Sequence, residues 1–314
     1  MKSIFKKSAV GNQSGGRPPA AVELSPEGVL AAALPAARAR RGASTPEQGC
    51  VYAFAPLAPG ALVPSLDEPN LRAPEAVASA IDATLAQVAP RARAVTLILP
   101  DTLVRIFVLD FDSLPAKASE AVSVVRFRLR KMVPFDVESA GVSYQVLAQN
   151  ESECKAIAAV VPGPVLTEYE AVVRAAGYEP GAVLSSSLAA LAVTDSTEGV
   201  MAANVSARSI TTTVSSGQDL LLYRTLDLPS EPATRAAEIA RSIAVATAYF
   251  EDKLGAPPRK LYYAGIQSPS EFAESIGDPG IAIVEWAGRP EEGALTALPQ
   301  ASFAGVAGAL AGAS

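Results

Sequence analysis

The sequence predicts an α/β protein in which one fold is built twice, in two successive halves of the chain. Clusters of short strand-like segments are followed by helical segments, and this order occurs in both halves. Some strand-like segments, such as residues 94–99 (AVTLIL), are continuous apolar runs, which are typical of strands covered on both faces. The 314 residues, 49% hydrophobic and 18% charged, are enough for two domains or one elaborate domain.

The first half is expected to span residues 20–194, after a flexible lead-in over 1–19 that is rich in Gly, Ser and Asn. A hairpin is predicted over 20–34, because a Ser-Pro-Glu-Gly turn separates two apolar stretches. Further strands are predicted over 49–54, 94–99, 104–110, 142–147, 155–161 and 183–184, and helices over 74–88, 115–132, 164–176 and 185–193.

The segment from 114 to 147 organises this half. Apolar residues recur at steps of three and four from Ala118 to Met132, which predicts an amphipathic helix. Pro134 should end that helix, because proline removes a backbone donor and restricts the residue before it. Phe135, an acidic turn and a strand carrying Tyr144 then follow.

The second half is expected to span 195–314. Strands are predicted over 200–205, 209–215 and 219–227, followed by a long helix over 231–254 whose core face carries residues four and three apart. A strand over 260–264, a helix over 268–275, a strand over 281–286 and a small Ala/Gly-rich helix over 302–313 complete it. Only Leu228 and residues 229–237 separate Asp227 from Glu238, so nothing large is inserted between the strands and the long helix.

Composition excludes several kinds of chemistry. The chain has no histidine, which removes Ser-His and Cys-His catalysis and histidine-ligated zinc. Its net charge of −6 argues against a general nucleic-acid binder. Cys50 and Cys154 lie far apart without metal spacing, and we expect small buried or half-buried thiols. We see no signal peptide and no run of 18 apolar residues that would span a membrane.

The helix, the triplet Val133-Pro134-Phe135 and the strand Ser143-Tyr144-Gln145-Val146-Leu147 together resemble a segment of the PilM family. PilM is the cytoplasmic actin-like protein of type IV pilus assembly and is related to the cytoplasmic part of GspL. The mid-helix Tyr169 and the Ala-Gly-x-x-Pro turn at 176–180 also match the family. The resemblance implies an actin-like ATPase (ribonuclease H-like) duplicated fold, with a Pro-Phe subdomain at about 94–150 and a reduced second-half subdomain.

The family's nucleotide turns are altered here. Actin-like ATPases place acidic, Gly-containing turns beside the phosphates and a carboxylate beside magnesium. Glu23 stands where an Asp is expected, but Pro26 removes an N–H from that turn, and Asn204 replaces the second Asp. Gly265 is the single glycine where the family has a pair. Glu23, Asn204 and Gly265 therefore mark a degenerate nucleotide cleft. We expect no cofactor and no ATP hydrolysis, and an ATPase that still holds Mg-ATP is the alternative.

The resemblance implies a scaffold of a pilus or secretion platform that binds the cytoplasmic N-terminal peptide of a PilN-like membrane protein. The candidate groove residues are Arg126, Leu129, Arg130, Met132, Val133 and Phe135. An alternative for Leu129 and Met132 is the helix's core face, whereas Phe135, after the helix-ending proline, is expected to be a partly exposed anchor. Further expectations are ring self-association, contact with a pilus motor ATPase, a cytoplasmic location with only indirect membrane contact, and a role in pilus biogenesis and twitching motility. A GspL-like domain that recruits a secretion ATPase is a second alternative.

Overall fold

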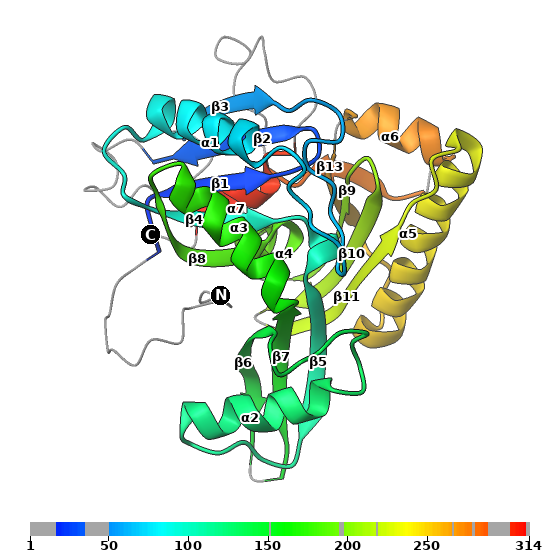
Figure 1. The fold of residues 1–314 in the computed structure, drawn as a ribbon. Coiled ribbons are helices and arrows are strands. Elements are labelled where there is room, and N and C mark those ends of the chain that lie inside the picture. Colours follow the sequence, from blue (N-terminus) through cyan, green and yellow to red (C-terminus); the bar gives the residue numbers. More distant parts are fainter. Residues whose placement is uncertain are drawn as a thin grey trace. The chain divides into compact units, whose positions relative to one another are not determined.

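The structure is a computed structural model that describes residues 17–34, 50–150, 152–194, 198–217, 219–265, 267–277, 280–287 and 302–311. These residues form two compact units (Figure 1). The first unit holds the described residues up to Ala192 together with the C-terminal helix from Gly305, and the second is Val193–Ala304. Most of the predicted lead-in over 1–19 lies outside the described residues.

The first unit is built on a five-stranded sheet of order β3-β2-β1-β4-β8. Its strands are β1 (Ala20–Leu24), β2 (Gly28–Ala33), β3 (Val51–Pro56), β4 (Ala94–Leu99) and β8 (Glu179–Ser185). The first three are antiparallel, whereas β4 runs parallel to both β1 and β8. The helices α1 (Pro74–Val88) and α3 (Gly163–Ala175) contact each other on this sheet, α1 over β2 and β3 and α3 over β8. Strands β1, β2 and β4 bury nearly every residue, as continuous apolar runs predict, whereas most residues of β3 at the sheet edge are partly or fully exposed.

A second, three-stranded antiparallel sheet of order β5-β7-β6 is inserted between β4 and α3. It consists of β5 (Arg105–Phe111), β6 (Gly141–Gln149) and β7 (Cys154–Val161), and the helix α2 (Ala118–Leu129) packs on one face (Figure 1). Val125 and Leu129 on α2 and Ala158 and Val160 on β7 form its core. We call this part the small subdomain.

The second unit repeats the strand order of the first. Its sheet is β11-β10-β9-β12-β13, with β9 (Gly199–Val205), β10 (Ser209–Ser216) and β11 (Asp219–Asp227) antiparallel and β12 (Lys260–Ala264) parallel to both β9 and β13 (Ala282–Glu285). The helices are α5 (Pro232–Leu254) and α6 (Pro269–Ile276). Because both sheets have the same order and the same strand directions, the predicted duplicated α/β fold is confirmed. Only residues 228–231 separate β11 from α5, so the reduced second-half subdomain is confirmed as well.

Two boundaries differ from the prediction. The Pro-Phe subdomain was expected at about 94–150, but its sheet runs from Arg105 to Val161, because β4 pairs with β1 and β8 in the main sheet. The second half was expected to run to 314, but the last helix, α7 (Ala304–Ala311), groups from Gly305 onward with the first unit. Its small residues allow that close packing: a Cβ at Gly308 would lie 2.0 Å from the carbonyl oxygen of Ala189.

The remaining short elements surround the end of β4. They are the 3-10 turns at Asp101–Leu103 and Leu191–Val193 and the helix α4 (Ser186–Ala190). The Ser185 side chain makes no capping bond to α4, although a serine before a helix predicts one. The Asp101 carboxylate does this instead, accepting from the Ser187 backbone N–H at 2.9 Å. Cys154 is buried and Cys50 half-buried, as predicted.

Candidate functional site

The first unit contains a groove of about 530 Å³ between three segments that lie far apart in the sequence. One wall is the loop after β3, another is the turn after α2, and the third is the start of α3 with the residue before it. The lining residues are Leu66, Asp67, Glu68, Pro69, Phe135, Asp136, Ser139, Pro162, Gly163, Pro164, Val165 and Glu168. We call this the subdomain groove. The turn belongs to the small subdomain, whereas the loop follows strand β3 of the main sheet and α3 packs on that sheet.

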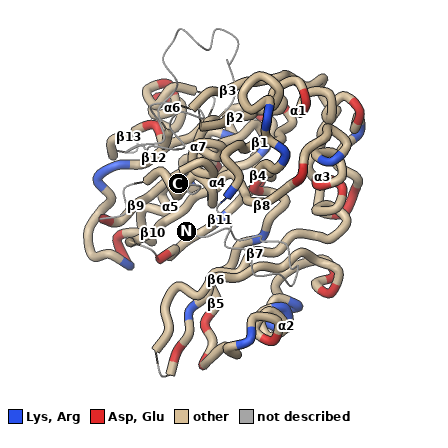
Figure 2. The backbone as a smooth tube through the Cα atoms, turned by 90° about the vertical axis from the view of Figure 1, so that its left-hand side faces the viewer, with Lys and Arg blue, Asp and Glu red and all other residues tan. Residues whose placement is uncertain are grey.

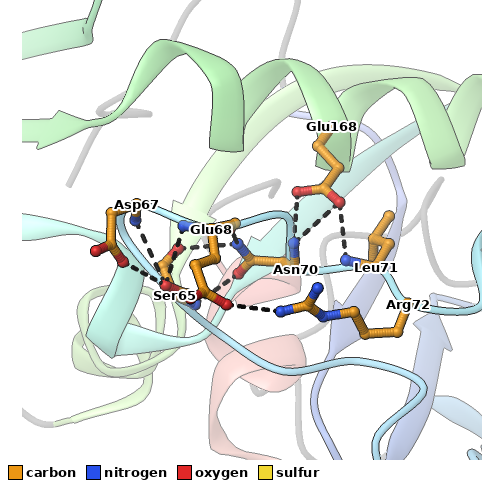
Figure 3. Close-up of polar contacts among 7 residues, drawn as sticks. All are labelled: Ser65, Asp67, Glu68, Asn70, Leu71, Arg72 and Glu168. Carbon is orange, nitrogen blue, oxygen red and sulfur yellow. Dashed lines mark hydrogen bonds and ion pairs between the residues drawn. The ribbon is translucent and has the colours of Figure 1, made fainter.

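The loop wall is held by one carboxylate from α3 (Figure 3). Glu168 accepts hydrogen bonds from the backbone N–H of Asn70 at 2.9 and 3.0 Å and from that of Leu71 at 2.8 Å. The buried Asn70 side chain in turn donates to the carbonyl oxygens of Ser65 and Glu68, both at 2.8 Å. The loop is therefore fixed from both sides, although it has almost no regular secondary structure.

The turn wall is held by arginines from α2. Arg126 donates through Nη1 to the carbonyl oxygens of Val137 and Ala140. Within the turn, the Asp136 carboxylate accepts from the backbone N–H of Glu138 at 3.0 Å and of Ser139 at 3.2 Å. The bonds from Glu138 and Ser139, with a smaller contribution from the Arg126 charge, lower the pKa of Asp136, so this side chain is ionised at neutral pH.

The third wall approaches the turn very closely. A Cβ built at Gly163 would lie 2.1 Å from the carbonyl oxygen of Ser139, so only glycine fits at this point. Pro164 follows in the first turn of α3, where its missing N–H is not needed. Val165 is 3% exposed and anchors this turn in the core. The groove is thus formed where the small subdomain meets the main sheet.

The residues predicted from the sequence to bind a peptide have different positions. Phe135 is half-buried and lines the subdomain groove, where its role in binding stays a prediction. Val133 packs partly buried against the core of the small subdomain, and Leu129 is fully buried there. Leu129 therefore belongs to the core face, the alternative considered above, because a side chain without exposed surface is out of a partner's reach.

The other three lie near the groove without lining it. Arg126 is used in holding the turn, and Arg130 forms an ion pair with Glu138. Met132 is 42% exposed. Lys and Arg residues lie along α2 (Figure 2), and of these Arg126 and Arg130 bond to residues of the turn.

Sequence reasoning missed two walls of the groove. The loop residues and the start of α3 were treated only as a Pro/Gly loop and a helix, although Pro162-Gly163-Pro164 marks an unusual strand-to-helix junction. It also missed Phe127, which is 72% exposed on α2. Periodicity placed Val125 and Leu129 correctly on the inward face of α2, but it also placed Ala118 and Met132 there, which are exposed, and it left out the buried Ala121. It gave no signal for Phe127 on the outer face.

Glu23 lies in the first unit, on β1, and its carboxyl group is buried. The Ser186 hydroxyl forms a hydrogen bond with this group, whereas Oε2 has no partner among the described residues. Burial raises the pKa of Glu23 to about 8, with smaller contributions from the charges of Asp101 and Glu27. Without a cation beside it, this carboxyl group is therefore mostly protonated at neutral pH.

Asn204 and Gly265 lie in the second unit. They are close together, because β9 and β12 pair with Asn204 opposite Ala264. The space beside Gly265 within this unit is a cavity of about 20 Å³, also lined by Tyr263 and Phe303, which is room for about one water molecule. No cluster of three metal-ligating side chains occurs among the residues that the structure describes.

The comparisons with known proteins support the fold. No family model and no curated protein matches the sequence. Among solved structures, the chain is similar to the PilM-PilN type IV pilus biogenesis complex, with a TM-score of 0.66 and 17% identity over 95% of this chain and 99% of that chain. The cytoplasmic domain of EpsL from the type II secretion system of Vibrio cholerae matches with a TM-score of 0.47 and 16% identity, over 78% of this chain and 80% of that one. A Bacteroides thetaiotaomicron protein with an actin-like ATPase fold matches with a TM-score of 0.44 and 12% identity, over 89% of this chain and 96% of that one. The predicted actin-like fold and the structural resemblance to PilM are confirmed.

Proposed function

We propose that this protein is a scaffold of a type IV pilus or related secretion platform, and that its subdomain groove binds a short cytoplasmic peptide of a PilN-like membrane protein. The observation that carries the proposal is the groove itself. It is large enough for several side chains, it has apolar walls, and hydrogen bonds and close packing hold its three segments in place. A preformed groove binds a flexible peptide at a lower entropic cost than a groove that must first be ordered.

Support also comes from the similarity to a PilM chain that was solved with PilN, since the alignment covers 95% of this chain. Peptide grooves of this type bind extended segments through apolar contacts and a few placed polar groups. Here Phe135 and the prolines at positions 69, 162 and 164 would supply the apolar contacts.

The same proposal includes a cytoplasmic location beside the inner membrane, reached through the membrane partner. Among the described residues, no helix combines the length and the apolar character needed to cross a bilayer. We also propose that the protein does not hydrolyse ATP, because Pro26 removes an N–H from the first turn, Asn204 offers an amide in place of a carboxylate, and Gly265 is a single glycine. Ring self-association, recruitment of a motor ATPase and a role in twitching motility stay predictions.

A groove-filling substitution tests the proposal. Ser139→Trp places a large ring in the groove, whereas Ser123→Trp makes the same change on the exposed side of α2, away from the lining residues. Calorimetric titration with a synthetic PilN-type N-terminal peptide should show binding to the wild type and to Ser123→Trp and a loss of at least about tenfold in Ser139→Trp. Equal affinities for the two variants, or no binding to the wild type, would refute the proposed function.

A further inference from the structure

The polar part of the subdomain groove consists of acidic side chains. Asp67 and Glu68 come from the loop, Asp136 from the turn and Glu168 from α3. No lysine or arginine is among the lining residues. Three separate segments thus bring four carboxylates to one apolar groove.

Two of these four carboxylates, Asp67 and Glu168, have only neutral hydrogen-bond partners. Glu68 is paired with Arg72, whose Nη2 lies 2.7 Å from Oε2. Glu168 accepts only from backbone N–H groups, and Asp67 accepts from the Ser65 hydroxyl at 2.7 Å (Figure 3). Hydrogen bonds from neutral donors orient a carboxylate but bring no positive charge to offset its own.

Asp136 is partly compensated. Arg126 acts on it from behind the turn, but the nitrogen Nη1 of Arg126 is used in bonds to the carbonyl oxygens of Val137 and Ala140. Arg130 is paired with Glu138, which is not a lining residue. After Arg72 and Arg126 are counted, the groove still carries more negative than positive charge.

We propose that the subdomain groove selects a peptide that carries a cationic side chain among apolar ones, with the cation held between Asp67 on the loop wall and Asp136 on the turn wall. This inference rests on the proposed function, since it specifies the chemistry of the same peptide. Apolar residues of the peptide pack on Phe135 and the prolines, and an arginine or lysine offsets the uncompensated carboxylates. Acidic and phosphorylated segments are rejected by the same charges.

A substitution scan of the peptide tests the selection. Every position of the PilN-type peptide is replaced in turn by Arg, Gln and Glu, and each form is titrated against the full chain at low and at high salt. At one position at least, we expect Arg to bind about tenfold more tightly than Gln at 20 mM salt, and Glu more weakly than Gln. The ratio of the affinities of the Arg and Gln forms should fall to about twofold at 0.5 M salt, because the Debye length shrinks to a few ångström and salt ions screen the exposed charges.

The double variant Asp67→Asn/Asp136→Asn locates the effect. At position 67 the amide keeps an oxygen that can accept from the Ser65 hydroxyl. At position 136 it keeps the acceptor for the Glu138 N–H but loses the one for the Ser139 N–H, so the affinity for the Gln form reports whether the turn wall keeps its shape. We expect the double variant to bind the Gln form as the wild type does and to lose the preference for Arg. Asp112→Asn, an exposed aspartate outside the lining, is the matched control and should keep the preference.

The outcomes separate the two claims. If the peptide binds but Arg, Gln and Glu are equivalent at every position, the charge selection is wrong while the groove proposal stands. If the preference is present but survives in the double variant, other residues hold the cation and this assignment is overturned. If no form of the peptide binds, the proposed function fails, and the inference fails with it.

Discussion

The Glu168 carboxylate holds the loop wall of the groove, and its removal gives the most direct structural prediction. Glu168→Ala deletes the acceptor of the bonds from the backbone N–H groups of Asn70 and Leu71. Asn70 is 0% exposed and Leu71 is 8% exposed, so water replaces the lost acceptor poorly. A buried donor left without a partner costs about 1–3 kcal/mol. Because Glu168 itself is half-exposed, we expect a loss of about 2–4 kcal/mol in the free energy of unfolding of the first unit.

Urea denaturation and amide hydrogen exchange measure this effect together. Exchange at Asn70 and Leu71 should become much faster in Glu168→Ala, and peptide affinity should fall as the wall loosens. Glu168→Gln keeps one acceptor oxygen and should lose about half as much stability. Thr167→Ala, one residue away on the exposed side of α3, should change stability by less than about 0.5 kcal/mol. If Glu168→Ala and Thr167→Ala unfold at the same urea concentration, the carboxylate does not hold the loop.

Three further predictions concern the core, the buried carboxyl group and the close contact at the groove. Leu129→Ala should destabilise the small subdomain by about 2–5 kcal/mol in urea denaturation, and the exposed Met132→Ala by less than about 1 kcal/mol; similar losses would contradict the core position of Leu129. The native state favours the protonated form of Glu23, so the contribution of this proton to the free energy of unfolding is complete below pH 4.5 and is lost as the pH rises to about 8. The total loss over this range is at most ~5 kcal/mol. Stability measured against pH should change less in Glu23→Gln, and the same pH profile in both proteins would contradict the prediction. In Gly163→Ala the added methyl group would overlap the Ser139 carbonyl oxygen, so the turn must move, and peptide affinity measured by calorimetry should fall by at least about tenfold. An affinity equal to that of the wild type would show that this movement does not disturb the groove.

The fold was predictable from the sequence because its strands and helices have strong local patterns. Residues 94–99 form a continuous apolar run and are a buried strand, and the helix predicted over 74–88 has those bounds in the structure. Helix α2 was expected to continue to residue 132, just before Pro134, but it ends at Leu129. The chain continues there as a turn, in which the Met132 N–H donates to the Leu129 carbonyl oxygen at 2.8 Å. Boundaries that depend on strand pairing, such as the start of the small subdomain at Arg105, were missed because pairing is not a local property.

The groove was predictable only in part. Phe135 follows a helix-ending proline, and that local signal led to a side chain that does line the groove. Leu129 has the same apolar character and lies six residues earlier, but periodicity alone does not say whether such a residue contacts a partner or the core. Glu168 and the 66–69 loop are about 100 residues apart in the chain, so only the folded structure brings them together.

The central claim is that the subdomain groove of the first unit is the peptide-binding site. Amide hydrogen exchange of the full chain, with and without saturating PilN-type peptide, tests it most directly. We predict slower exchange at residues 66–69, 135–139 and 163–168 and unchanged exchange across β9 to β13. Protection confined to the second unit, or no protection at the three groove segments under saturating peptide, would contradict the account.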